Sequence, residues 1–259
     1  MEQLTFGSSI KKSWISTWQA IVHMPGLFLG VFAVIACTAV LSSSFQQPLV
    51  AGGDFDPSMA TYHAFERLIL SLLQLAVSGC LVVKVVRFVL LGEGTQPLMP
   101  LGGKPLGRYL LFSLGIGIGM IIITVGTAMV LHTMRSATIG LIILPLLAVY
   151  LFVLIRLSLL YPAIALGSRL ALRAAWQDSR GHFWYITGVG VVTYLPLLLV
   201  WIIAMQVGGR TLLMASLEGS LAITIVMALG NTLFLVLSAS VVSWVYRRYA
   251  NALLDHVAY

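Results

Sequence analysis

Six long apolar segments constrain the fold more than any other feature of this sequence. Each contains about 20 predominantly apolar residues, the length that a helix needs to cross the hydrocarbon core of a bilayer. We expect spans at about 25–41, 68–91, 109–131, 139–160, 185–206 and 221–244. Backbone groups in lipid must be hydrogen-bonded internally, which favours helices, and the alternation typical of membrane barrel strands is missing from the sequence. The sequence therefore predicts an all-α, polytopic membrane bundle that forms a single domain over residues 1–259.

The composition agrees with this fold class. Hydrophobic residues make up 59% of the chain and charged residues only 9%, whereas about a quarter of the residues in soluble proteins are charged. The two cysteines, Cys37 and Cys80, fall in separate spans. Because this spacing does not match that of a metal site, we expect buried cysteines that act as small apolar side chains. Neither a metal nor a cofactor is predicted.

The placement of lysine and arginine predicts the orientation. With the N-terminus in the cytoplasm, twelve of the 15 Lys and Arg residues lie at cytoplasmic ends of spans, and only Arg67, Arg135 and Arg210 lie outside. This bias follows the positive-inside rule and predicts that both termini are cytoplasmic. The stretch Val34–Cys37 loosely resembles a lipoprotein cleavage box, but an apolar run that begins near Pro25 starts late for a signal peptide.

The net charge of +7 raises the question of an anionic partner. The basic residues lie next to the span ends, where attraction to anionic lipid headgroups contributes about 1 kcal/mol per residue. Anionic phospholipids are therefore the expected partners, and no nucleic acid is expected.

An amphipathic helix is predicted over about residues 8–24, with Ser8 or Ser9 as its N-cap. Trp14 and Trp18 share one arc with the isoleucines, while lysine, glutamine and hydroxyl side chains share the other. This pattern is typical of a helix that lies in the headgroup plane. Pro25 then allows the chain to turn into the membrane.

A second interfacial helix is predicted over about residues 162–181, with Pro162 in its first turn and Gly181 at its end. Asp178 lies on its small-residue face, and we expect a basic partner for it, such as Arg87 or Arg156. The opposite face carries basic and aromatic side chains that we expect to reach lipid phosphates. These are Arg169, Arg173, Trp176 and Arg180.

Polar side chains near or within the spans are the remaining candidates for binding. Arg87 and Arg156 lie in cytoplasmic-end turns, where they either extend to the headgroup region or bind a lipid phosphate with the guanidinium fork. Gln74 and Asn231 lie near the bilayer midplane. Amides there hydrogen-bond between helices or, as the alternative, belong to a substrate site.

Other motifs favour packing over catalysis. Gly115 and Gly119 form a small-xxx-small pattern, which predicts a close contact with another helix. The sequence contains no HExxH, GxSxG or CxxC motif and no acidic residue near the middle of a span. We therefore do not expect an enzyme.

Four stretches carry a resemblance to a known family. They are RFVLLGE (Arg87–Glu93), RYLLFSL (Arg108–Leu114), RLSLLYPAIAL (Arg156–Leu166) and ALRAAWQDSRGHFW (Ala171–Trp184). The plan resembles that of six-helix bacterial inner-membrane proteins grouped around the membrane domain of glycerophosphoryl diester phosphodiesterases, and especially their stand-alone relatives. In the enzyme-linked members, catalysis belongs to a separate soluble domain that begins with HRG, a motif that this sequence lacks. The resemblance therefore implies a membrane module of the bacterial inner membrane without the enzyme.

Three classes of function follow from these patterns. The first is a non-enzymatic membrane module, subunit or envelope-homeostasis factor that binds anionic lipid and a membrane-protein partner or a second copy of itself. The second is a transporter or lipid-translocating protein, which proline-containing spans would suit. An intramembrane lipid enzyme is the third, and the missing nucleophile, base and metal set disfavours it. A continuous polar cavity that reaches Gln74 and Asn231 would favour transport, whereas a sealed bundle would favour the module.

Overall fold

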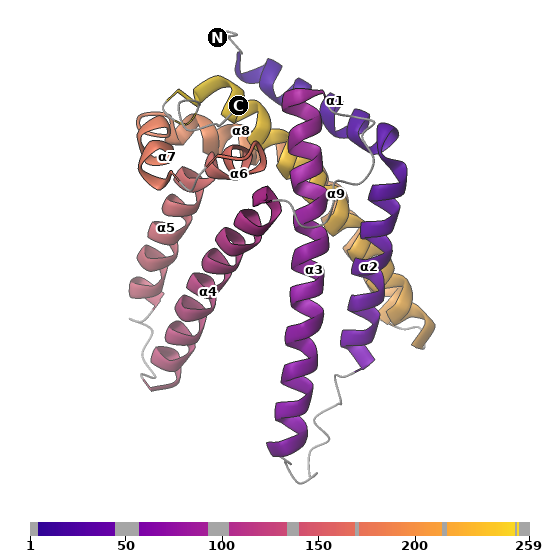
Figure 1. Cartoon of the computed structure of the whole chain (residues 1–259). Coiled ribbons are helices and arrows are strands. Elements are labelled where there is room, and N and C mark those ends of the chain that lie inside the picture. The colour runs from indigo at the N-terminus through magenta and orange to yellow at the C-terminus, as the bar shows by residue number, and fades with distance from the viewer. Residues whose placement is uncertain are drawn as a thin grey trace.

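The computed structural model describes residues 5–44, 57–92, 104–133, 140–168, 171–213, 217–251 and 253. Within these residues it contains nine helices and no strand (Figure 1). The helices are α1 (Phe6–His23), α2 (Pro25–Ser44), α3 (Pro57–Leu91), α4 (Lys104–Thr133), α5 (Gly140–Leu157), α6 (Leu160–Ala165), α7 (Leu172–Asp178), α8 (Phe183–Leu213) and α9 (Leu217–Tyr249). The all-α class predicted from the sequence is confirmed.

Six stretches of these helices are long and apolar enough to cross a membrane. They are Pro25–Ser42, Phe65–Leu91, Lys104–Thr127, Pro145–Ala165, Phe183–Ala204 and Leu221–Tyr249. Each overlaps one of the six predicted spans, so the chain is a multi-pass helical membrane protein. The start of α1 and the end of α9 lie at the same end of the bundle, together with α6 and α7 (Figure 1).

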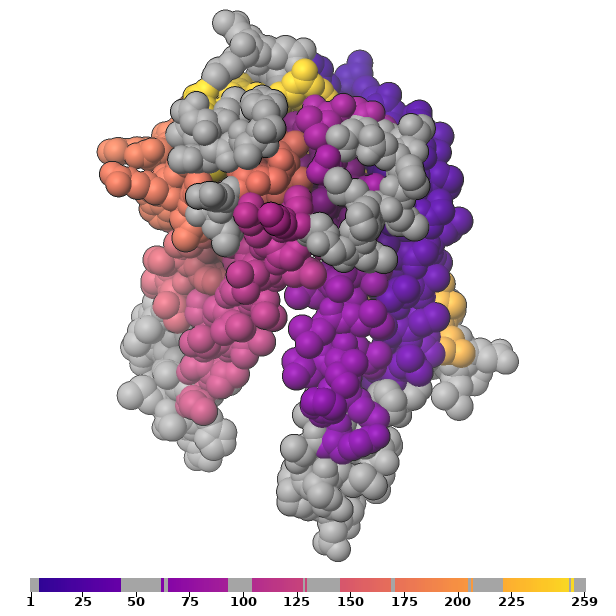
Figure 2. All heavy atoms as spheres, in the orientation of Figure 1, coloured from indigo at the N-terminus to yellow at the C-terminus, as the bar shows by residue number. Residues whose placement is uncertain are grey.

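The core forms around α9, which packs against α1, α2, α3 and α8. Its central side chains, such as Val236 and Leu237, are fully buried, as is Val85 near the end of α3. Away from this core, apolar side chains such as Leu72 of α3 and Ile118 of α4 are exposed. Figure 2 shows a hollow between α3 and α4 that opens away from α1. The well-packed half of the bundle is therefore the half that carries the short helices.

Helix α1 lies across this end of the bundle with its small hydroxyl side chains turned inward. Ser13 and Thr17 are buried, and each hydroxyl donates to the backbone carbonyl four residues earlier at 2.8 Å. Trp14 and Trp18 are exposed instead. The exposure of the tryptophans agrees with the apolar arc of the sequence pattern, but half of the predicted polar arc packs against protein. Because these small side chains donate their hydroxyl hydrogens to carbonyls of α1 itself, they need no partner on α9, and α1 can approach α9 closely.

The start of α1 also differs from the prediction. Thr5 is the N-cap, and its hydroxyl accepts a hydrogen bond from the backbone N–H of Ser8 at 3.4 Å. The predicted caps, Ser8 and Ser9, lie inside the first turn, where both hydroxyls donate to the carbonyl of Thr5. Three neighbouring hydroxyl residues all suit a cap, so the sequence pattern did not distinguish them.

The single interfacial helix predicted over 162–181 is wrong, because α6 ends at Ala165 and α7 begins only at Leu172. Gly167 has φ +97°, and the N–H groups of Gly167 and Ser168 donate to the carbonyls of Ile164 and Ala163. This is a Schellman motif, which ends a helix at a left-handed glycine. Gly181, the predicted terminator, has φ +82° and follows α7 instead.

Close helix contacts use other glycines than the predicted pair. A Cβ at Gly115 would meet none of the described atoms within 4 Å, and one at Gly119 would lie 3.6 Å from the Tyr150 ring. The tight contacts are at Gly79, 3.0 Å from Tyr109, and at Gly230, 2.3 Å from Trp201. The predicted small-residue interface is therefore wrong at Gly115. It is confirmed only as an ordinary contact at Gly119.

Candidate functional site

The short helices and the adjoining span ends carry most of the positive charge. We call this region the basic end of the bundle. Among the described residues, it comprises eleven lysines and arginines: Lys11, Lys12, Lys84, Arg87, Lys104, Arg108, Arg156, Arg173, Arg180, Arg247 and Arg248. Asp178 is the one carboxylate among the described residues of this region, because Glu66 and Glu218 lie near the far ends of α3 and α9.

Five cations of the basic end are exposed and six are partly buried. The exposed ones are Lys11, Lys104, Arg173, Arg180 and Arg247. Two tryptophans at the same end are strongly exposed, Trp184 at 82% and Trp18 at 69%. Tryptophan prefers the headgroup level of a membrane, where its apolar ring and its N–H are both stabilised. The combination of exposed cations and tryptophans is therefore typical of a surface that lies among lipid headgroups.

Arg156 and Trp176, two of the predicted lipid contacts, contact each other. The guanidinium carbon of Arg156 lies 4.6 Å from the centre of the Trp176 ring and 4.8 Å from that of Phe152. One Nη of Arg156 also approaches the carbonyl oxygen of Trp176 at 3.5 Å. These contacts attach α7 to the end of α5, and cation–π contacts of this kind contribute about 0.5–2 kcal/mol. Arg156 is therefore held by protein groups, while 40% of Trp176 remains exposed.

Aromatic rings also position basic side chains where α1 meets α9. Trp244 lies between Lys12 and Arg247, whose charged groups are 5.0 Å and 5.3 Å from its ring centre. Its Nε1 donates to the hydroxyl of Ser16 at 3.0 Å, which joins α9 to α1. The face of an aromatic ring attracts a cation without cancelling its net charge. This junction therefore fixes two cationic side chains against one aromatic ring.

A second aromatic group joins α1, α8 and α9. The Arg248 guanidinium lies 4.2 Å from the Tyr185 ring centre and donates to its hydroxyl. The Tyr185 and Ser9 hydroxyls are 3.1 Å apart, and the Phe6 ring meets the Tyr185 ring edge-on. Tyr185 therefore connects the first helix of the chain to the last two.

Asp178 accepts hydrogen bonds from two backbone amides that follow α9. The N–H groups of Asn251 and Leu253 both lie 3.0 Å from its Oδ2. A basic partner was expected for this carboxylate, such as Arg87 or Arg156. Backbone amides at the end of the last helix are the partners observed here, and they attach α7 to the segment that follows α9. Such charge-assisted bonds are stronger than neutral ones.

The other predicted headgroup contacts differ in their surroundings. Arg173 on α7 and Arg180 in the turn after it are both exposed. Arg87 is partly buried in the last turns of α3. Arg169 lies outside the described residues. Arg173, Trp176 and Arg180 are therefore all exposed, within α7 and the turn that follows it.

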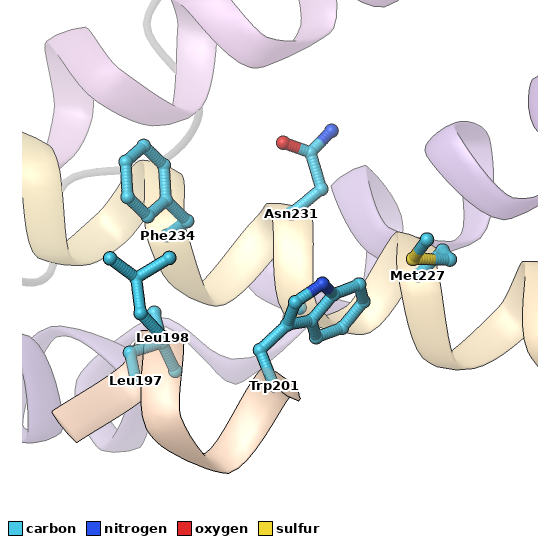
Figure 3. Close-up of a pocket in the computed structure, with 7 residues that line it drawn as sticks. Leu197, Leu198, Trp201, Met227, Asn231 and Phe234 are labelled. Atoms are coloured by element: carbon cyan, nitrogen blue, oxygen red, sulfur yellow. The ribbon is translucent and has the colours of Figure 1, made fainter. Parts of the chain in front are cut away.

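The two predicted midplane amides lie in separate pockets. Gln74 lines a space of about 400 Å³ between α2 and α3, and Asn231 lines one of about 280 Å³ between α8 and α9. Figure 3 shows the Asn231 amide pointing away from the Trp201 indole, which lies against α9. Asn231 is exposed and Gln74 is partly buried. The structure therefore does not bring the two amides into one site.

The sequence does not predict the contacts that some residues of the basic end make. Arg108 donates to the carbonyl oxygens of Gly167 and Ser168 at 3.1 Å and 3.0 Å, and so secures the end of α6. Its partners lie about sixty residues away, so local spacing gives no signal for this contact. The pairing of Lys12 with Trp244 is of the same kind. Within the described part of the chain, no group of three or more His, Cys, Asp or Glu side chains is arranged to hold a metal ion.

Comparisons of the chain with family models, curated proteins and solved structures give no match.

Proposed function

We propose that this chain is a non-enzymatic integral membrane module whose basic end binds anionic phospholipid headgroups. The observation that carries the proposal is the charge balance of that end. Eleven described cations stand against one described carboxylate, and Asp178 is already bonded to two backbone amides. A surface of this charge attracts anionic headgroups over a distance of about 8–10 Å at moderate salt.

The exposed side chains set the scale of the attraction. At about 1 kcal/mol for each basic residue near the surface, the five exposed cations contribute on the order of 5 kcal/mol. Trp18 and Trp184 add apolar anchoring at the same level. Three of the partly buried cations, Lys12, Arg156 and Arg248, lie against aromatic rings, which supports a fixed rather than a diffuse arrangement of their charge.

Orientation and location are part of the same proposal. The basic end faces the cytoplasm, because lysine and arginine concentrate on that side of membrane proteins. Both termini are then cytoplasmic, in keeping with the shared position of the start of α1 and the end of α9. The resemblance to stand-alone relatives of the phosphodiesterase membrane domain supports the bacterial inner membrane as the location. A membrane-protein partner or a second copy of the chain completes the module.

The separation of Gln74 from Asn231 supports the module over a transporter. A transport path needs polar groups that follow one another across the bilayer. The two amides line different pockets between different helix pairs. Apart from Asn231, the pocket between α8 and α9 is lined mainly by apolar side chains.

Replacing Arg173 and Arg180 together by glutamine tests the lipid-binding role. Both side chains are exposed, so the fold should be retained. Each charge contributes about 1 kcal/mol to the attraction, so the affinity for anionic phospholipid can fall by at most about 30-fold. We expect a several-fold loss of bound anionic phospholipid. Native mass spectrometry of the purified protein with anionic and zwitterionic lipids measures the loss directly.

Two controls make the result specific. The Arg173→Lys/Arg180→Lys pair keeps the charge and should keep most of the binding, whereas Gln177→Ala changes an exposed neutral residue of the same helix and should alter nothing. Unchanged retention of anionic lipid in the glutamine pair would show that these arginines act only as a topology signal.

A further inference from the structure

A polar groove lies between α2 and α3, in the part of the bundle away from the basic end. We call it the α2–α3 groove, and its volume is about 400 Å³. Apart from Ala39 and Leu70, its lining is polar. The polar lining residues are Thr38 and Ser42 of α2 and Arg67, Ser71 and Gln74 of α3.

The helical repeat explains why these residues share one space. Arg67, Ser71 and Gln74 follow at i, i+4 and i+7 and therefore form one stripe along α3. Thr38 and Ser42 are separated by four residues and form the facing stripe on α2. Helices α2 and α3 pack against each other, so the two stripes border the groove from opposite sides. Apolar neighbours on the same helices, such as Leu72, are exposed.

The position of Arg67 along α3 places the groove at the second membrane surface. Twenty residues separate Arg67 from Arg87, which corresponds to about 30 Å of helix and to the thickness of the hydrocarbon core. With Arg87 at the headgroup level of the basic end, Arg67 reaches the headgroup level of the opposite leaflet. Gln74 then lies about 10 Å deeper. The groove therefore runs from the headgroup level into the hydrocarbon region.

The chemistry of the lining matches that of a glycerophospholipid along the same direction. A guanidinium at the outer end suits a phosphate, because its fork of N–H groups binds two oxygens at once. Its five donors allow it to serve a phosphate and a protein group together. The hydroxyls of Ser42 and Ser71 and the amide of Gln74 can donate to glycerol and ester oxygens further in. Thr38 is buried, and its hydroxyl donates to the carbonyl of Ile35 at 3.0 Å, so it presents acceptor lone pairs.

We propose that the α2–α3 groove binds the glycerophosphate part of a phospholipid from the leaflet opposite the basic end. Arg67 binds the phosphate, Ser42 and Ser71 bind the glycerol oxygens, and Gln74 binds an ester carbonyl. The acyl chains stay in the bilayer beside the exposed apolar surface of α3. Polar groups at this depth are costly unless they are hydrogen-bonded, so a ligand whose polarity falls with depth suits the groove. This site is separate from the basic end and stands independently of the function proposed there.

Photo-crosslinking with a phospholipid probe tests this site. The probe carries a diazirine near the ester of one acyl chain, and the crosslinked peptide is identified by mass spectrometry. We expect a crosslink to α2 or α3 that falls several-fold in Arg67→Gln and in Gln74→Leu. Arg67→Lys should restore part of it, because lysine keeps the charge without the fork.

A matched control separates binding from general disturbance. Asn231→Leu makes the same amide-to-leucine change in the pocket between α8 and α9, and the crosslink to α2 or α3 should persist. If the Arg67→Gln variant does not fold, Ser71→Ala is a milder change of the same groove, and it should also weaken the crosslink. Arg173→Gln/Arg180→Gln should leave this crosslink intact, so that a failure here and a failure at the basic end are distinguishable.

Competition identifies the source of the phosphate. Inorganic phosphate and glycerol phosphate lack acyl chains and should not displace the probe, whereas unlabelled phospholipid should. Displacement by inorganic phosphate as effective as that by phospholipid would assign the groove to a free anion and overturn the proposal. Equal crosslinking in wild type, Arg67→Gln and Gln74→Leu at equal thermal stability would overturn it as well.

Discussion

The contact between α8 and α9 depends on the absence of a side chain at Gly230. A Cβ at this position would lie 2.3 Å from Cζ3 and 2.8 Å from Cε3 of Trp201. Both atoms belong to a rigid indole, so the clash cannot be relieved by bending a flexible chain end. In Gly230→Ala, the ring has to move off α9 or the two helices have to separate. Either response weakens the packing of α8 on α9.

The expected size of this effect follows from two opposing contributions. Overpacking of this kind lowers the free energy of unfolding by about 1–3 kcal/mol. Exchange of glycine for alanine within a helix raises it by about 1 kcal/mol. A net loss of about 1–2 kcal/mol remains when the clash falls in the upper part of that range, as the 2.3 Å approach indicates. For a chain of this length, we expect the melting temperature to fall by about 2–8 °C.

Thermal unfolding in detergent measures this change for Gly230→Ala and a control. Gly117→Ala changes a glycine of α4 whose added Cβ would meet none of the described atoms within 4 Å, so its melting temperature should not fall. In a Trp201→Leu background, Gly230→Ala should not destabilise the protein, because the indole is gone and only the gain of about 1 kcal/mol in helix propensity remains. The double-mutant cycle should then give a coupling of about 2–3 kcal/mol. Equal melting temperatures for Gly230→Ala and wild type would refute the reasoning.

Two further predictions concern the short helices. Gly167→Ala places a side chain at φ +97° and should cost about 1–2 kcal/mol in thermal stability, whereas Gly7→Ala, with open space around it, should not. A normal melting temperature for Gly167→Ala would contradict the Schellman ending of α6. Asp178→Ala removes the acceptor of the Asn251 and Leu253 amides and should cost about 1.5–3 kcal/mol, with faster hydrogen exchange at both amides. Asp178→Asn keeps one acceptor oxygen and should lose less, and unchanged exchange in the alanine variant would argue against this contact.

The elements predicted well are those whose signal is local in sequence. A span is recognised by about 20 consecutive apolar residues, so all six were found, although α3 begins at Pro57, well before the predicted boundary near residue 68. The break between α6 and α7 was missed because two glycines, Gly167 and Gly181, both suit a helix end. Only the conformation of each shows that Gly167 terminates α6.

The candidate sites were predicted by residue type but not by grouping. Arg156 and Trp176 were both selected, yet their contact joins two helices with a break between them, and no short spacing indicates it. The sequence predicts that Gln74 and Asn231 both lie near the midplane, whereas the neighbours of Gln74 in the structure include Arg67, which the charge pattern places in an outer loop. The helical stripe that joins Arg67 to Gln74 is visible in the sequence. The facing stripe on α2 became a neighbour only through packing.

The sequence by itself determined that the chain crosses a membrane six times and that its cations gather at one end, because hydropathy and charge act through the solvent around each segment. The tertiary structure alone decided which side of α1 faces protein, which glycines are tightly packed and which polar stripes border a common groove. Those features depend on the shape of a surface from elsewhere in the chain. In lipid, where tails are as apolar as the side chains, close fit rather than hydrophobicity selects the contacting faces.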